Sequence, residues 1–309
     1  MSSPDHSNLS SGFLALAPEE QATDLTAPHI TDILIAERGQ QIMSTRWWPL
    51  VRPLAHKVLH YQKARKMADD LSNLSAQAVF QYLSRRLNLA VTALNSERVP
   101  VNGSVVLVSN HPTGIGDGIA LYDAIKARRR DLSIFANRDA TRVAPRLDEM
   151  IIPVEWRSEF KSKSKTKETL RYSGKAFDDE RAVVLFPSGR LAYWADGKLN
   201  ERPWMTSAVA LARRNSAPVI PVHISARNSG LFYFLARVST ELRDMTVFHE
   251  LLNKKNQPFS VHFGHPIEPD ALRGDLETVT KRLQAHCAVT LKDNLDARFD
   301  VNAELPAAP

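Results

Sequence analysis

The chain has 309 residues, of which 43% are hydrophobic and 24% charged, a composition typical of a folded protein with one large domain or at most two. Its single cysteine, Cys287, excludes an intramolecular disulfide framework, and its ten histidines show no metal-ligand spacing, so we expect no bound metal. The formal net charge of +6 favours an anionic partner.

The two ends of the chain lack a sustained apolar pattern. Residues 1–40 contain serine, proline and acidic side chains with scattered apolar positions, so we expect a mobile N-terminal tail with a little helix. Residues 301–309 are expected to form a loose C-terminal tail. No window approaches the ~18 consecutive apolar residues of a spanning helix, and the start has no signal-peptide pattern, so neither is expected.

Residues 41–90 form a predicted amphipathic helical segment, with helical spacing over 47–66 and 71–89. The stretch 46–66 carries basic side chains and no acidic one, and Pro53 predicts a kink in it. Two interpretations remain open: this stretch lies on an anionic membrane surface, or it packs on the protein core with a solvated basic back. Its apolar stripe consists of Trp47, Leu50, Val51, Leu54, Val58 and Tyr61.

Strand and helix patterns alternate over residues 104–224 and are followed by a strand at 259–263 and a helix at 276–295. Such alternation predicts an α/β fold with a mixed, largely parallel sheet covered by helices. We therefore expect one α/β domain over residues 91–300, preceded by a helical, membrane-facing segment.

A glycine-rich turn over residues 109–118 lies between the strand at 104–108 and the helix that follows, where α/β enzymes usually place their chemistry. It contains His111, which can take a proton near neutral pH, and Asp117, whose carboxylate can orient the imidazole ring. Asn110 fits either an Asx-type turn or a substrate contact. The alternative is a purely structural turn in which Asp117 caps the helix.

Two more strand-turn motifs follow in the sequence, at residues 182–190 and 218–224. Together with the turn at 109–118 they resemble the motif blocks of the glycerophospholipid acyltransferase superfamily, which includes the 1-acyl-glycerol-3-phosphate acyltransferases. Residues 135–138 and 151–154 fall where that family has its second block. The stretch 247–267 is similar to a bacterial branch that includes enzymes acting on amino-acid-linked lipids. The resemblance covers about residues 85–290.

The resemblance implies a transfer of an acyl group from a thioester, on coenzyme A or acyl carrier protein, to the hydroxyl of a lyso-lipid. His111 would be the general base and Asp117 its orienting partner. Arg190, with Ser188 and Gly189 in the same turn, and Arg138 would bind a phosphate or another anionic head group. Thr113 and Asn110 would support the turn or contact substrate. No cofactor is implied beyond the acyl donor.

The sequence departs from the family pattern at two places. Five residues separate His111 from Asp117 where the family usually has four, and glycines at 114 and 116 can absorb the additional residue. Ser188 stands where the family usually has glutamate, and Arg190 lies one position nearer the glycine than the usual arginine.

Two other functions remain open from the sequence: an N-acyltransferase that forms the amide of an amino-acid lipid, and a non-catalytic module that binds lipid surfaces. The basic runs at 128–130 and 161–167 favour anionic lipid or an acidic carrier protein. They lack interleaved aromatic residues, so no nucleic-acid partner is expected. We expect a peripheral protein on the cytoplasmic face of the cell membrane.

Overall fold

The computed structural model describes residues 28–155 and 160–304. Within these residues, seven strands form one sheet in the order β1-β9-β8-β2-β5-β3-β4. Neighbouring strands are parallel except β8 and β9, which are antiparallel, so the sheet is mixed and largely parallel, as the sequence predicts. The strands are β1 (Ala90–Leu94), β2 (Val105–Ser109), β3 (Leu132–Asn137), β4 (Ile151–Val154), β5 (Ala182–Leu185), β8 (Val219–Ser225) and β9 (Pro258–Phe263).

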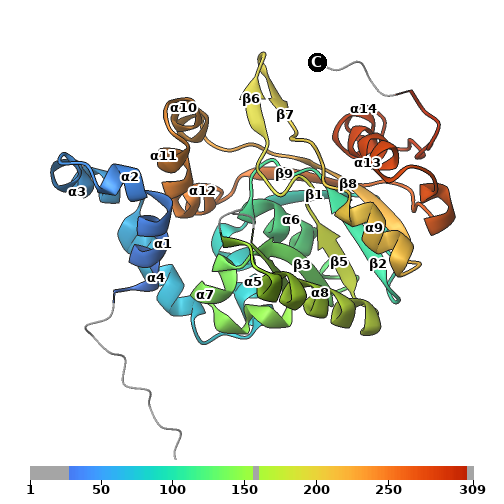
Figure 1. Cartoon of the computed structure of the whole chain (residues 1–309), viewed down its shortest axis with the longest axis horizontal. Coiled ribbons are helices and arrows are strands. Elements are labelled where there is room, and N and C mark those ends of the chain that lie inside the picture. Colours follow the sequence, from blue (N-terminus) through green and yellow to red (C-terminus); the bar gives the residue numbers. More distant parts are fainter. Residues whose placement is uncertain (1–27, 156–159, 305–309) are drawn as a thin grey trace, which may run out of the picture.

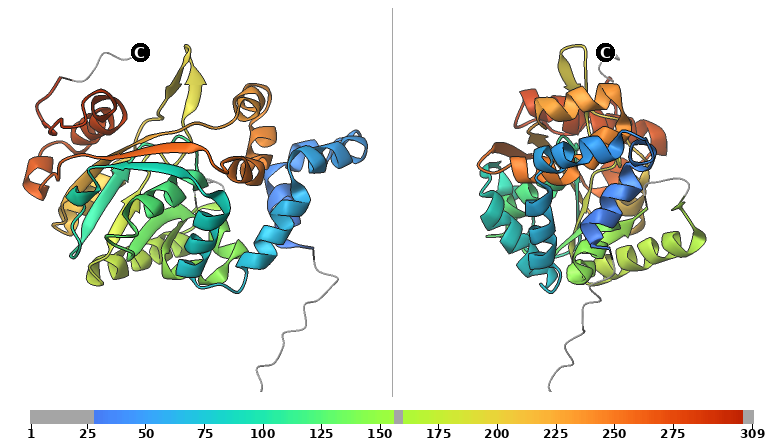
Figure 2. Two further views of the ribbon diagram at one scale, coloured as in Figure 1. Left: turned by 180° about the vertical axis from the view of Figure 1, so that it is seen from behind. Right: turned by 90° about the vertical axis from the view of Figure 1, so that its left-hand side faces the viewer.

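Helices cover both faces of this sheet because its central strands are apolar on both sides. Alternate residues of β2 point to opposite faces: Val105 and Leu107 belong to one core cluster, Val106 and Val108 to the other. Figure 2 shows α5 and α8 on opposite sides of the sheet. The first cluster includes residues of α5 (Ala76–Leu87) and α6 (Ile115–Ile125); the second includes residues of α8 (Lys163–Asp178), α9 (Ser207–Arg214) and α13 (Leu276–Ala285).

Two additions to the sheet lie near the carboxyl ends of its central strands. A hairpin of β6 (Tyr193–Ala195) and β7 (Lys198–Asn200) projects away from the sheet (Figure 1). Three helices connect β8 to β9, namely α10 (Gly230–Val238), α11 (Thr240–Met245) and α12 (Val247–Asn253). The other short elements are α7 (Asp139–Val143), α14 (Leu291–Asp293), a π-helical turn at His286–Thr290, and 3₁₀ turns at Ser96–Arg98, Pro145–Glu149 and Pro269–Leu272.

The N-terminal helices lie at one end of the molecule, beside α10–α12 (Figure 1). They are α1 (Ile30–Arg38), α2 (Gln40–Met43), α3 (Trp48–Val58) and α4 (Tyr61–Leu71). The structure corrects the predicted tail over residues 1–40, because Leu34 of α1 is 1% exposed and Arg38 pairs with Asp139 at 2.6 Å. Residues 1–27 of that tail, and 305–309 of the C-terminal one, lie outside the described residues.

The helical stretch predicted over residues 47–66 is divided into α3 and α4. His60 adopts a left-handed backbone conformation with φ of 53°, which an α-helix does not accommodate. Tyr61 is buried, whereas the rest of the predicted apolar stripe is exposed; Leu50 on α3 is 71% exposed, and Trp47, directly before α3, is 72% exposed. None of the helices in the described chain is both long enough and apolar enough to cross a membrane.

Candidate active site

The glycine-rich turn leaves the carboxyl end of β2, between the ends of its parallel neighbours β5 and β8. The side chain of His111 is 17% exposed there, and its ring stacks on Phe186, which directly follows β5, with 4.3 Å between ring centroids. The segments that follow the adjacent strands β2 and β5 therefore meet at this edge of the sheet, as in other α/β folds.

His111 and Asp117 meet across the turn. Nδ1 of His111 lies 2.9 Å from Oδ2 of the fully buried Asp117. The ring nitrogen and carboxylate are at ion-pair distance, but their alignment falls short of a hydrogen bond and leaves Nδ1 without a hydrogen-bond partner. Catalytic contacts are often loose before substrate binds, so this geometry suits a histidine that becomes charged during a reaction.

Asp117 also holds the turn itself. Its carboxylate accepts hydrogen bonds from the backbone N–H of Thr113 at 2.9 Å, the N–H of Gly114 at 3.0 Å and the hydroxyl of Thr113 at 2.6 Å. The bond to Gly114 caps the start of α6, so the structural and the ring-orienting interpretations of Asp117 describe the same side chain. Gly114 has φ of 91°, a left-handed conformation that accommodates the additional residue.

The polar side chains at 110 and 113 are bonded within the protein. The Asn110 amide donates to the carbonyl of Ile224 at 2.9 Å and accepts from its N–H at 2.7 Å, which joins the turn to the end of β8. The Thr113 hydroxyl gives its one proton to Asp117. The structure therefore places Asn110 and Thr113 as supports of the turn.

Glu201 is a site residue that the sequence analysis missed. Its Oε2 accepts from the backbone N–H of His111 at 3.2 Å, and its Oε1 accepts from the indole N–H of Trp204 at 3.2 Å. The carbonyl of His111 accepts from the N–H of Ala192 at 3.0 Å, so both backbone groups of the histidine are held. Burial raises the pKa of Glu201 above its usual value, and the hydrogen bonds that it accepts from His111 and Trp204 offset only part of that rise.

The turn after β5 presents the other predicted residues. Ser188 is buried and donates from its hydroxyl to the carbonyl of Arg190 at 2.8 Å, while Gly189 has φ of 60°. The Arg190 side chain is exposed. Arg138, at the end of β3, instead pairs with Glu168 of α8 at 2.6 Å.

No cluster of three or more His, Cys, Asp and Glu side chains suited to a metal ion occurs in residues 28–155 and 160–304. The site as described consists of a histidine held by its backbone, a buried carboxylate and an exposed arginine nearby. A histidine paired with a buried carboxylate can act as a base toward a hydroxyl or an amine.

The known proteins that are similar to this chain are acyltransferases. The model of the family described as Acyltransferase matches residues 90–225. The chain is 24% identical over 217 residues to a lyso-glycine lipid O-acyltransferase of Phocaeicola vulgatus, covering 68% of this chain and 76% of that protein. The corresponding figures for a lyso-glycine lipid O-acyltransferase of Bacteroides thetaiotaomicron are 23% over 218 residues, 68% and 78%.

A solved structure also aligns with the chain. The crystal structure of the 1-acyl-sn-glycerophosphate (LPA) acyltransferase PlsC from Thermotoga maritima is similar at a TM-score of 0.43 and 15% identity, and the alignment covers 87% of this chain and 99% of that one.

Proposed function

Because this chain belongs to the glycerophospholipid acyltransferase superfamily, we propose that it transfers a fatty acyl group from an acyl thioester to the hydroxyl of a lyso-lipid, with His111 as the general base. The observation that carries the proposal is the contact between His111 and the buried Asp117 at 2.9 Å. The two similar curated proteins are both named for O-acyl transfer to a lyso-lipid, which favours a hydroxyl acceptor over an amine.

The proposed reaction uses both nitrogens of the His111 ring. Nδ1 faces Asp117, so Nε2 takes the proton of the acceptor hydroxyl while the hydroxyl oxygen attacks the thioester carbonyl. The resulting tetrahedral intermediate collapses by breaking the carbon–sulfur bond, and the imidazolium returns its proton to the leaving thiolate. Asp117 stabilises the imidazolium between these two steps.

The first turn of α6 is suited to stabilise the oxyanion of that intermediate. The N–H groups of Thr113 and Gly114 already donate to Asp117. Ile115 and Gly116 are the first residues of the helix, and backbone N–H groups at that position have no partner within the helix. A helix N-terminus favours negative charge. Arg190, exposed in the turn after β5, would bind an anionic group of a substrate.

We propose peripheral attachment to an anionic membrane on its cytoplasmic side, and the exposed apolar face of α3 supports the attachment. Trp47, Leu50 and Leu54 are each more than 60% exposed, and the surrounding stretch 46–66 is basic. Such a helix buries apolar side chains at the lipid head-group boundary while its cationic residues attract anionic lipid. A surface position would place the active site next to its lipid acceptor.

The test is transfer of labelled palmitate from acyl-CoA and from acyl carrier protein to a panel of lyso-lipids, with one amine-bearing acceptor included. We expect transfer to a hydroxyl acceptor by the wild type and none by folded His111→Ala. Transfer only to the amine would favour the N-acyl reaction, and unchanged turnover in the variant would contradict the role of His111. Comparison of the two donors identifies the thioester used.

A further inference from the structure

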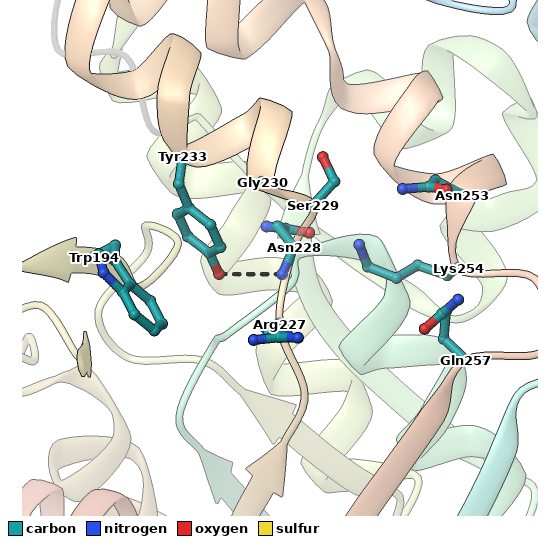
Figure 3. A pocket seen from close by; sticks show the side chains of 9 residues that line it. All are labelled: Trp194, Arg227, Asn228, Ser229, Gly230, Tyr233, Asn253, Lys254 and Gln257. Atoms are coloured by element: carbon teal, nitrogen blue, oxygen red, sulfur yellow. Dashed lines mark hydrogen bonds between the residues drawn. The ribbon is translucent and has the colours of Figure 1, made fainter. Parts of the chain in front are cut away.

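A cavity of about 500 Å³ lies beside the active-site turn, bounded by the β6–β7 hairpin, the segment after β8, α10 and the end of α12 (Figure 3). Trp194 of the hairpin and Tyr233 of α10 form one side, where their rings lie 5.8 Å apart. Arg227 and Asn228 come from the segment after β8, and Lys254 follows α12. Of these residues, Lys254 alone lies in a stretch that the sequence analysis singled out, residues 247–267.

The cavity adjoins the turn that holds His111. The side-chain N–H of Asn228 points to the carbonyl of Pro112 at 3.5 Å. A Cβ placed on Gly116 would lie 3.6 Å from Cγ of Lys254, so the lysine stem packs directly against the start of α6. A molecule in this cavity would therefore lie next to the turn that carries His111 and Asp117.

Cations outnumber carboxylates in the cavity wall. The Lys254 residue is 3% exposed, and its ammonium donates to Glu250 at 3.1 Å. Glu250 also accepts hydrogen bonds from the N–H and the hydroxyl of Ser229. The ammonium group of Lys254 has three N–H donors, so two remain besides the one that binds Glu250. Among the described residues, no carboxylate forms an ion pair with the exposed Arg227, so its guanidinium adds an uncompensated charge.

Tyr233 adds a neutral donor to these cations. Its hydroxyl oxygen accepts from the backbone N–H of Asn228 at 3.1 Å (Figure 3), which leaves its own proton to donate elsewhere. Burial raises the pKa of Tyr233, so the hydroxyl stays protonated at neutral pH. The cavity thus offers guanidinium, ammonium and hydroxyl donors together, a set that suits an oxyanion.

One acceptor in the wall has no partner. Asn228 is 4% exposed, and its side-chain oxygen forms no hydrogen bond within the described structure. Buried polar atoms are usually paired because an unpaired one loses its bond to water without replacement. A ligand that carries an N–H or O–H next to its anionic group would satisfy this oxygen.

We propose that this cavity binds the head group of the lyso-lipid acceptor, and that this head group carries a carboxylate or phosphate beside an amide N–H or a hydroxyl. The assignment rests on the proposed acyl transfer, since it gives the acceptor a place next to His111. Arg227, Lys254 and Tyr233 bind the oxyanion, and the Asn228 side-chain oxygen accepts from the neighbouring donor.

The experiment measures calorimetric binding of short-chain probes to the full chain and to Arg227→Gln. The probes are a lyso-lipid with a glycine head group, a lysophosphatidate, an uncharged monoacylglycerol, and coenzyme A. Arg214→Gln is the matched control, because Arg214 is an exposed arginine on α9, away from the cavity. We expect Arg227→Gln to raise Kd roughly tenfold or more for the anionic lyso-lipids only, and Tyr233→Phe to raise it less.

Several results would overturn the assignment. These are equal Kd values for wild type and Arg227→Gln, no binding of either anionic lyso-lipid, or a loss confined to coenzyme A. If Arg227→Gln weakens binding of one of the two anionic lyso-lipids more than the other, that difference shows whether the cavity prefers a carboxylate or a phosphate. Binding that depends on Arg227 in a protein that transfers no acyl group would contradict the proposed function and leave the cavity assignment standing.

Discussion

Nδ1 of His111 and Oδ2 of Asp117 lie 2.9 Å apart although five residues separate them in the sequence, one more than the related motif usually has. Gly114, with φ of 91°, turns the chain so that Asp117 reaches back to both Thr113 and the imidazole. The pairing therefore depends on a backbone conformation that glycine adopts readily.

Asp117→Asn should lower kcat by about 10²- to 10⁴-fold, because the amide cannot stabilise an imidazolium as a carboxylate does. The variant keeps one acceptor oxygen for the N–H of Thr113 or Gly114, so the fold should persist with a loss of about 1 kcal/mol from weakened capping. Steady-state kinetics with circular dichroism separate the two effects. A kcat within threefold of wild type would rule out the orienting role.

Glu201→Ala should lower kcat while leaving KM for the acyl donor nearly unchanged, because it frees the backbone N–H of His111 without touching a substrate pocket. A fall of roughly tenfold is expected for a positioning residue. Glu201→Gln retains an oxygen for the His111 N–H and should recover part of the rate. Glu277→Ala, on an exposed face of α13, is the control. A donor KM that rises instead would place Glu201 in substrate binding.

Combined replacement of Trp47, Leu50 and Leu54 by alanine should reduce binding to anionic vesicles at least about tenfold, since these side chains supply exposed apolar area on α3 and at its N-cap. Co-sedimentation with phosphatidylglycerol vesicles measures this partition, and phosphatidylcholine vesicles test the charge contribution. Leu170→Ala, at an exposed leucine of α8, should leave binding unchanged. Equal sedimentation of the triple variant and the wild type would exclude α3 as the membrane contact.

His286 should make the fold sensitive to mild acid. Burial, followed by the nearby His262 and His265, lowers the pKa of His286 from 6.5 to about 4. In the unfolded chain this histidine takes up a proton below pH ~6.5, whereas in the folded chain it does so only near pH ~4. The free energy of unfolding is therefore greatest above pH ~6.5 and decreases as the pH falls toward ~4.

Denaturant unfolding at about pH 7 and about pH 5 measures this contribution, which we expect to reach about 1–2 kcal/mol. His286→Gln cannot titrate and should show a correspondingly smaller loss between the two pH values. The same loss in variant and wild type would mean that other groups cause the acid sensitivity.

The sequence predicted those parts of the fold and site that depend on local pattern. The apolar run at β2, the turn with His111 and Asp117, and the strand at β9 all carry their signal within about ten residues. Both residues of the histidine–aspartate pair lie in one turn, so sequence spacing could suggest their contact.

The remaining parts depend on contacts between distant segments. Glu201 reaches His111 only because the antiparallel β6–β7 hairpin returns the chain to the turn, and no residue type or spacing near position 201 signals this. The division between α3 and α4 occurs at His60, a residue with no strong turn preference. Whether the apolar stripe of α3 faces core or solvent was open from periodicity alone, since both arrangements give the same spacing.

The antiparallel pairing of β8 with β9 decides which loops reach the site. Because Ser225, at the end of β8, lies opposite Ser260, near the start of β9, the three-helix connection α10–α12 leaves and re-enters the sheet at one edge. Both of its ends, Arg227 and Lys254, thus line the same cavity. Connections vary in sequence more readily than the strands that they join, so substitutions at the two ends of this one would alter the head-group preference while the strand order stays the same.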